Sequence, residues 1–112
     1  MAITNTRLTT VDPTTVFQAV GQQAITVIYL CNTGNADVSV NVFCVNSDDS
    51  VGASEDNMIY NQLLITAGNA SPGGGDTYVI STEKLILDNN DFIGVEANIA
   101  NMITVTVSSI EV

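Results

Sequence analysis

The sequence predicts an all-β fold: a single antiparallel β-sandwich, of jelly-roll or immunoglobulin-like type, with seven to eight short strands. Apolar and polar residues alternate along Val38–Val45, as they do in a strand with one buried face. Similar short runs recur at intervals of roughly ten residues, separated by clusters of Gly, Asn and Asp. No segment carries the period of a helix longer than one turn.

The chain of 112 residues has the length of one domain. Residues 1–13 are expected to form an extended N-terminal arm that ends at Pro13, because proline biases the residue before it toward extended backbone. Such an arm is able to exchange between subunits of an oligomer. Residues 14–112 are expected to form the β-sandwich domain.

Residues 24–46 are predicted to form a β-hairpin, with strands Ala24–Cys31 and Val38–Val45 joined by the polar turn Asn32–Asp37. In the simplest register Cys31 lies opposite Val38 and Cys44 lies opposite Ile25. The two sulfur atoms are then about 20 Å apart, whereas a disulfide needs Cα atoms within about 7 Å. We therefore expect two free thiols.

The remaining elements follow from the same pattern of short apolar runs and polar turns. We expect strands at Val16–Val20 (one turn of helix is the alternative there), Met58–Ile65 (interrupted by Asn61-Gln62), Asp76–Thr82, Lys84–Leu87, Phe92–Ala97 and Met102–Val112. We expect loops at Ser47–Asn57 and Thr66–Gly75 and a tight turn at Asp88–Asp91. The period of two predicts a core of Ile25, Val27, Tyr29, Val38, Val40, Val42, Ile93, Val95, Ile103, Val105 and Val107.

The charge balance is strongly acidic, since twelve Asp and Glu oppose only Arg7 and Lys84 and give a net charge of −10. Phosphate backbones and anionic lipids repel such a chain, so we expect neither nucleic acid nor a membrane as partner. The first ten residues lack the basic and apolar regions of a signal peptide. No apolar stretch approaches the ~18 residues that span a membrane.

The residue types argue against an enzyme. The chain has no histidine, which excludes Ser-His-Asp and Cys-His catalytic groups and the usual general base. Asp88 and Asp91 form a carboxylate pair of the kind that cleaves glycosidic bonds, but they bracket Asn-Asn in a turn. We interpret them as side chains that hold the turn, and we predict no catalytic residues and no cofactor.

Two loops resemble ligand sites only in part. The loop Ser47–Asn57 offers four carboxylates to a calcium ion, Asp48, Asp49, Glu55 and Asp56, but their spacing differs from that of an EF-hand. We predict no metal site, and calcium binding by residues 48–56 stays an open alternative. Gly73–Gly75 lacks the Lys and Ser/Thr of a phosphate loop. The sequon Asn69-Ala-Ser71 is followed directly by Pro72, and we do not expect it to be glycosylated.

The chain has few aromatic residues that could form a sugar-binding site. Such sites usually stack aromatic rings on sugar faces, and this chain has no Trp. Its tyrosines are Tyr29, Tyr60 and Tyr78, and the predicted strand period places Tyr29 in the core. The outward positions Ser39, Asn41, Thr104, Thr106 and Ser108 are instead short and uncharged. Strand edges flanked by such residues are able to pair with further copies of the chain.

The chain resembles the small virion structural proteins of tailed bacteriophages. Residues 24–112 carry the resemblance, in the stretches Val27–Ala36, Val38–Phe43, Gly75–Asp91 and Val105–Ile110. It implies a non-enzymatic protein of the virion, made in the host cytoplasm, that associates with itself and with major capsid or other virion proteins. A capsid decoration or cement protein is the first hypothesis, and a trimer is expected if it occupies threefold positions. The alternatives are a neck or tail component, or a host-glycan binding module.

Overall fold

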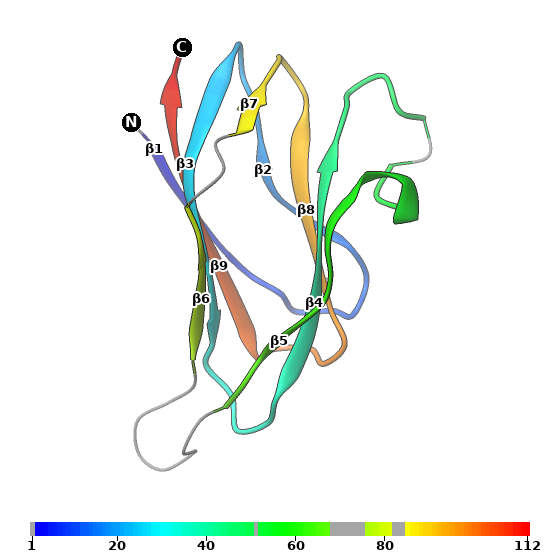
Figure 1. The fold of residues 1–112 in the computed structure, drawn as a ribbon, viewed down its shortest axis with the longest axis vertical. Helices are drawn as coiled ribbons and strands as arrows, with labels where there is room; N and C mark the ends of the chain where they lie inside the picture. The colour runs from blue at the N-terminus through cyan, green and yellow to red at the C-terminus, as the bar shows by residue number, and fades with distance from the viewer. Residues whose placement is uncertain (1, 51, 68–75, 82–84) are drawn as a thin grey trace.

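The computed structural model describes residues 2–50, 52–67, 76–81 and 85–112, which form two packed antiparallel sheets (Figure 1). The predicted β-sandwich is confirmed. The strands are β1 (Ala2–Arg7), β2 (Thr14–Gln18), β3 (Gln23–Asn32), β4 (Val38–Val45), β5 (Met58–Ile65), β6 (Thr77–Ile80), β7 (Leu85–Leu87), β8 (Phe92–Ala97) and β9 (Ile103–Glu111). A 3₁₀ turn, η1 (Glu55–Asn57), precedes β5.

The order of pairing is that of a jelly roll. The first sheet has the order β1-β9-β3-β6, and the second has the order β2-β8-β4-β5. The outermost strands in sequence therefore pair with each other, β1 with β9 and β2 with β8, and the pairing closes inward to β4 with β5. This arrangement results when the two halves of one chain pair antiparallel as a long hairpin and the hairpin then folds over into two sheets.

Nine strands are described where seven to eight are expected, because β6 and β7 share one position in the sheet. Both pair antiparallel with β3, β6 along Ile28–Cys31 and β7 along Gln23–Ile25. They lie end to end on the same edge of β3, so the sandwich has eight strand positions. The predicted break in β5 is also present, as Asn61 and Gln62 form a bulge opposite Asn41.

The predicted hairpin of residues 24–46 is wrong. β3 pairs with β9, β6 and β7 in the first sheet, whereas β4 pairs with β8 and β5 in the second. The segment between them crosses from one sheet to the other (Figure 1). The alternation along each strand reports which face is buried, and it does not report which strand lies alongside.

The side chain of Asn32 holds this crossing. Asn32 is 1% exposed, and its Nδ2 donates hydrogen bonds to the carbonyl oxygens of Ala36 (2.8 Å) and Ile65 (2.9 Å). Its Oδ1 accepts from the N–H of Gly34 at 2.9 Å. The amide thus ties the end of β3 to the crossing and to the end of β5 in the other sheet. A Cβ at Gly34 would lie 2.6 Å from the side chain of Met102, so a larger residue there would have to displace Met102.

We expect Asn32→Ala to lower the free energy of unfolding by about 2–4 kcal/mol, since it removes three hydrogen bonds and leaves the carbonyl of Ile65 without its amide partner. Urea unfolding followed by circular dichroism measures this change. Asn35→Ala, at an exposed position of the same crossing, is the matched control and should change stability little. Equal effects of both substitutions would contradict the role assigned to Asn32.

A β-bulge in β3 reverses which residues face the core. Ile25 pairs with Ser109 and Val27 pairs with Ser108, so Thr26 is an extra residue between them. Beyond the bulge Ile28 and Leu30 are buried, and Tyr29 is 41% exposed. The prediction that Val27 and Tyr29 lie in the core is therefore wrong, because one inserted residue moves every later side chain to the opposite face.

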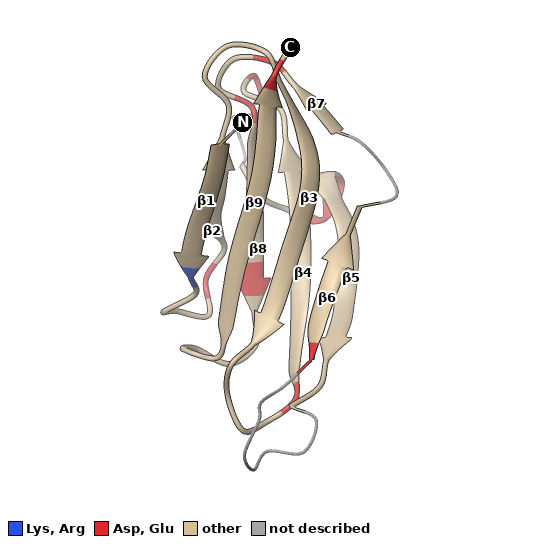
Figure 2. Ribbon diagram, turned by 90° about the vertical axis from the view of Figure 1, so that its left-hand side faces the viewer, with Lys and Arg blue, Asp and Glu red and all other residues tan. Residues whose placement is uncertain are grey.

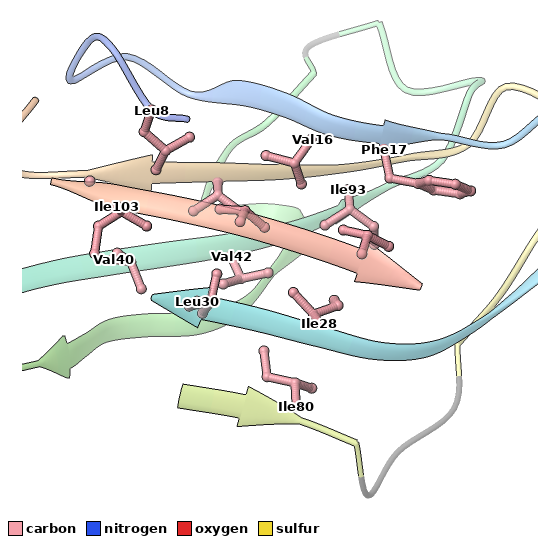
Figure 3. Packing of buried hydrophobic residues seen from close by; sticks show 14 of the residues in the cluster. Leu8, Val16, Phe17, Ile28, Leu30, Val40, Val42, Ile80, Ile93 and Ile103 are labelled. Carbon is pink, nitrogen blue, oxygen red and sulfur yellow. The ribbon is translucent and has the colours of Figure 1, made fainter. Parts of the chain in front are cut away.

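The rest of the predicted core is confirmed. Nine of the predicted residues are buried: Ile25, Val38, Val40, Val42, Ile93, Val95, Ile103, Val105 and Val107. Figure 3 shows how side chains from both sheets meet, with Ile28 and Leu30 of β3 facing Val40 and Val42 of β4. Leu8 and Phe17 extend this cluster at positions that the alternation had not marked as core.

The N-terminal segment expected as an extended arm is extended, and it is also part of the sandwich. Residues 2–7 form β1, which pairs with β9 of the same chain from Ala2↔Ser109 to Arg7↔Thr104. Leu8 follows with no exposed surface, and its backbone N–H donates to the carbonyl oxygen of Ile103 at 2.9 Å. The structure thus gives this segment a partner within its own subunit.

The hydroxyl of Ser109 lies in the core, next to the bulge, with no exposed residue surface and no hydrogen-bond partner for its Oγ. We expect Ser109→Ala to raise the free energy of unfolding by about 1 kcal/mol, since an unsatisfied buried hydroxyl is replaced by an apolar group of similar size. Thermal denaturation tests this. Ser108→Ala, on the opposite face of the same strand, is the control, and destabilisation by Ser109→Ala would show that the hydroxyl has a partner in solution.

Candidate functional surfaces

The acidic loop between β4 and η1 is organised by its own hydrogen bonds. Ser54 caps η1, because its Oγ accepts from the N–H of Asp56 at 3.2 Å and its N–H donates to Asn57 Oδ1 at 3.0 Å. The Nδ2 of Asn57 donates to Asp49 Oδ2 at 3.2 Å. The four loop carboxylates are not brought together, and the described residues contain no group of three or more His, Cys, Asp or Glu that could hold a metal ion.

Asp88 and Asp91 hold the turn between β7 and β8, in agreement with the interpretation from sequence. The Oδ2 of Asp91 accepts from the N–H of Asp88 at 3.0 Å, and its Oδ1 accepts from the N–H of Ser47 at 2.9 Å. These backbone donors, that of Ser47 first, hold the pKa of Asp91 below its ordinary value. Asp88 Oδ1 accepts from Gln22 Nε2 at 3.2 Å, so both carboxylates join this turn to neighbouring segments.

Asp91 gives the fold a dependence on pH. Because its pKa is lower in the folded than in the unfolded chain, its stabilising effect is complete above the unfolded pKa of about 3.9 and is lost as the pH falls through the folded pKa. We expect Asp91→Asn to lower the thermal midpoint at pH 7, and this deficit should narrow as the pH falls below about 4. Glu55→Gln, at an exposed carboxylate, is the control; a deficit independent of pH would contradict the assignment.

Both cysteines are free thiols in the structure, as expected, although the predicted register was not the reason. Cys31 lies on the outward side of β3, and Cys44 packs against the core from β4 in the other sheet. Burial raises the pKa of the Cys44 thiol, and the nearby carboxylate of Asp91 raises it further. Cys44 is therefore a protonated, weakly nucleophilic thiol at neutral pH.

The three tyrosines do not form one sugar-stacking platform. Tyr29 points outward from the middle of the first sheet. Tyr60 of β5 and Tyr78 of β6 meet edge to face at the seam between the two sheets, with ring centroids 6.1 Å apart. Beside them Ile59, Tyr60, Ile80 and Leu85 line a small apolar hollow of about 240 Å³.

A polar hollow of about 400 Å³ lies on the outer side of the second sheet, lined by Asn41, Gln62 and Glu96 among others. Its polar groups bind one another. Asn41 Nδ2 donates to Glu96 Oε1 at 2.8 Å, and the N–H of Gln62 donates to Asn41 Oδ1 at 2.7 Å. These contacts brace the bulge of β5 against β4 and β8, which is a structural use of the carboxylate.

The outer side of the first sheet has a different character. In its central row Asn5, Thr106, Tyr29 and Val79 lie side by side across β1, β9, β3 and β6. Figure 2 looks onto this side, where acidic residues are confined to the end of β9, to the loops and to the sheet behind. We call the outward-facing positions of the first sheet the carboxylate-free face, because no described residue among them is Asp or Glu.

Exposed apolar side chains are the second distinguishing property of the carboxylate-free face. Five large apolar side chains are exposed on it, from five different strands: Ile3, Tyr29, Val79, Ile86 and Ile110. Arg7 lies at one end of β1, where its Nη2 donates to the carbonyl oxygen of Asn101. The sequence did not reveal this face, because the period of two, continued past the bulge, placed Val27 and Tyr29 in the core.

Two features named from the sequence, Gly73–Gly75 and the sequon Asn69-Ala-Ser71, lie outside the described residues. Within the described part of the chain, no helix has the length and apolar character needed to cross a membrane. Comparison with protein-family models, curated proteins and solved structures found no match.

Proposed function

We propose that this chain is a non-enzymatic structural protein of a tailed-bacteriophage virion, a capsid decoration or cement protein that stabilises the head. The jelly-roll order of strand pairing is the observation that carries the proposal. Jelly rolls are a common architecture of viral capsid proteins, and of lectins and cupins as well. The fold supports the proposal by analogy, and the sequence resemblance to small phage virion proteins narrows it to this class.

The chemistry of the described surface supports a structural role. The carboxylates of Asp49, Asp91 and Glu96 accept hydrogen bonds from neighbouring groups of the same chain, so they serve the fold. A net charge of −10 suits the outside of a head, away from packaged DNA. The proposed partners are further copies of the chain and major capsid or other virion proteins, which a sheet face without carboxylates contacts mainly through apolar and uncharged polar groups.

A host-glycan binding module is the second candidate, and one observation favours it. Tyr29 is 41% exposed on a sheet face, where an aromatic ring is able to stack on a sugar. Jelly rolls also occur in lectins. A glycan array with the purified protein tests this candidate, with Tyr29→Ala as the variant that should lose any signal.

Labelling of the parent particle tests the principal proposal. We expect gold-conjugated antibodies against the purified protein to decorate the heads of purified virions, and particles from a strain that lacks the gene to remain unlabelled. Those particles should also release DNA at a lower temperature, because a cement protein adds contacts between capsid subunits. Gold at the neck or tail would favour the alternative position in the virion. The proposal would be overturned if wild-type virions carried no gold label at any position and the glycan array gave a signal that depends on Tyr29.

A further inference from the structure

We infer that the carboxylate-free face binds the same face of a second copy, so that two sandwiches stack sheet against sheet as a twofold dimer. The inference concerns the purified chain and holds wherever in a particle, or outside one, the protein acts. It assigns one surface and one partner to the self-association proposed above.

The first support is the gathering of exposed apolar side chains on one side. Ile3 is 66% exposed, Ile86 is 62% exposed and Val79 is 45% exposed, although they come from different strands. Single exposed apolar residues are normal on a protein surface, whereas a group that shares one sheet face marks an interaction site. Tyr29 lies at its centre, between Thr106 and Val79, and tyrosine is enriched in the cores of interfaces.

The second support is the distribution of charge. Two copies that each carry a net charge of −10 repel each other, and the repulsion is smallest where facing surfaces carry no carboxylate. The Glu96 side is separated from this face by the thickness of the sandwich, about 10 Å between the sheets. In a dimer formed through this face the Glu96 sides of the two copies therefore point away from each other, with three sheet spacings of about 10 Å between them. Of the two outer faces, the carboxylate-free one is thus the better suited to a second copy.

The third support is the available area. The face consists of six residues of β1, nine of β9, ten of β3 and the short strands β6 and β7, which at about 3.3 by 4.8 Å per residue gives roughly 500 Å² per copy before side-chain relief is counted. Two such faces bury about 1,000 Å² in total, which reaches the area that a specific interface needs. A sheet-on-sheet contact is also the packing that the two sheets of this chain already make.

The symmetry follows from the use of one face. An interface in which the same patch meets itself is isologous and closes at two copies. Tyr29, near the centre of the face, then lies close to Tyr29 of the second copy. A trimer, as expected for a protein on threefold positions, needs two different patches and does not arise from this contact.

Sedimentation and light scattering of the purified protein from micromolar to millimolar concentration test the inference. We expect a dimer of the 11.8 kDa chain that persists or tightens as salt is added, because its interface holds no ion pairs and salt screens the remaining repulsion. Tyr29→Glu places two carboxylates together at the centre and should raise the dissociation constant about 100-fold or more. Thr15→Glu, which adds the same charge to the exposed outer side of β2 in the second sheet, should leave the dimer intact.

Circular dichroism of each variant is the control that shows whether it is folded. Ile86→Glu is a second variant of the face, and its high exposure makes the monomer insensitive to the change, so it replaces Tyr29→Glu if that variant unfolds. A wild-type chain that stays monomeric at all concentrations and salt levels would overturn the inference. Equal dissociation by Thr15→Glu and the face variants would also overturn it, because the effect would then be one of net charge. These measurements need no virion, so they fail or succeed independently of the particle-labelling experiment.

Discussion

The passage of the chain from one sheet to the other after β3 is the constraint on which the sandwich depends. The buried amide of Asn32 bonds to the carbonyls of Ala36 and Ile65, which belong to the crossing and to the far sheet. With β3 and β4 separated in this way, each is free to take its long-range partner, β9 and β8 respectively. The nested pairing of the jelly roll follows, and it brings the two ends of the chain into one sheet.

The bulge at Thr26 has the next largest consequence, and it acts on the surface. One extra residue places Ile28 and Leu30 in the core and moves Val27 and Tyr29 to the outside. Without it Ile28 and Leu30 would face outward and Tyr29 would face the core. The bulge therefore places Tyr29 at the centre of the carboxylate-free face and the aliphatic side chains of Ile28 and Leu30 in the core.

The charges and polar groups divide between two tasks. Carboxylates such as Asp91 and Glu96 hold turns and bulges by accepting hydrogen bonds, and most of the remaining charge lies in loops. The first sheet keeps an outer side of threonine, serine and apolar residues, with Asn5 and Arg7 from β1. The chain has few cations to pair with its carboxylates. Keeping carboxylates off one face therefore lowers the electrostatic repulsion when that face contacts another acidic molecule. It supports a structural role in an assembly.

The sequence by itself determined the fold class, the positions of most strands and most of the core. Phe92–Ala97 is predicted and observed with the same limits, and Val38, Val40 and Val42 are buried as their spacing indicates, because alternation is a local property of one strand. Tertiary structure alone decided that β3 and β4 lie in different sheets and that residues 2–7 pair with β9. It also decided that Tyr29 faces outward. These outcomes depend on hydrogen bonds between residues far apart in the chain and on one bulge, and neither leaves a periodic trace in a single sequence.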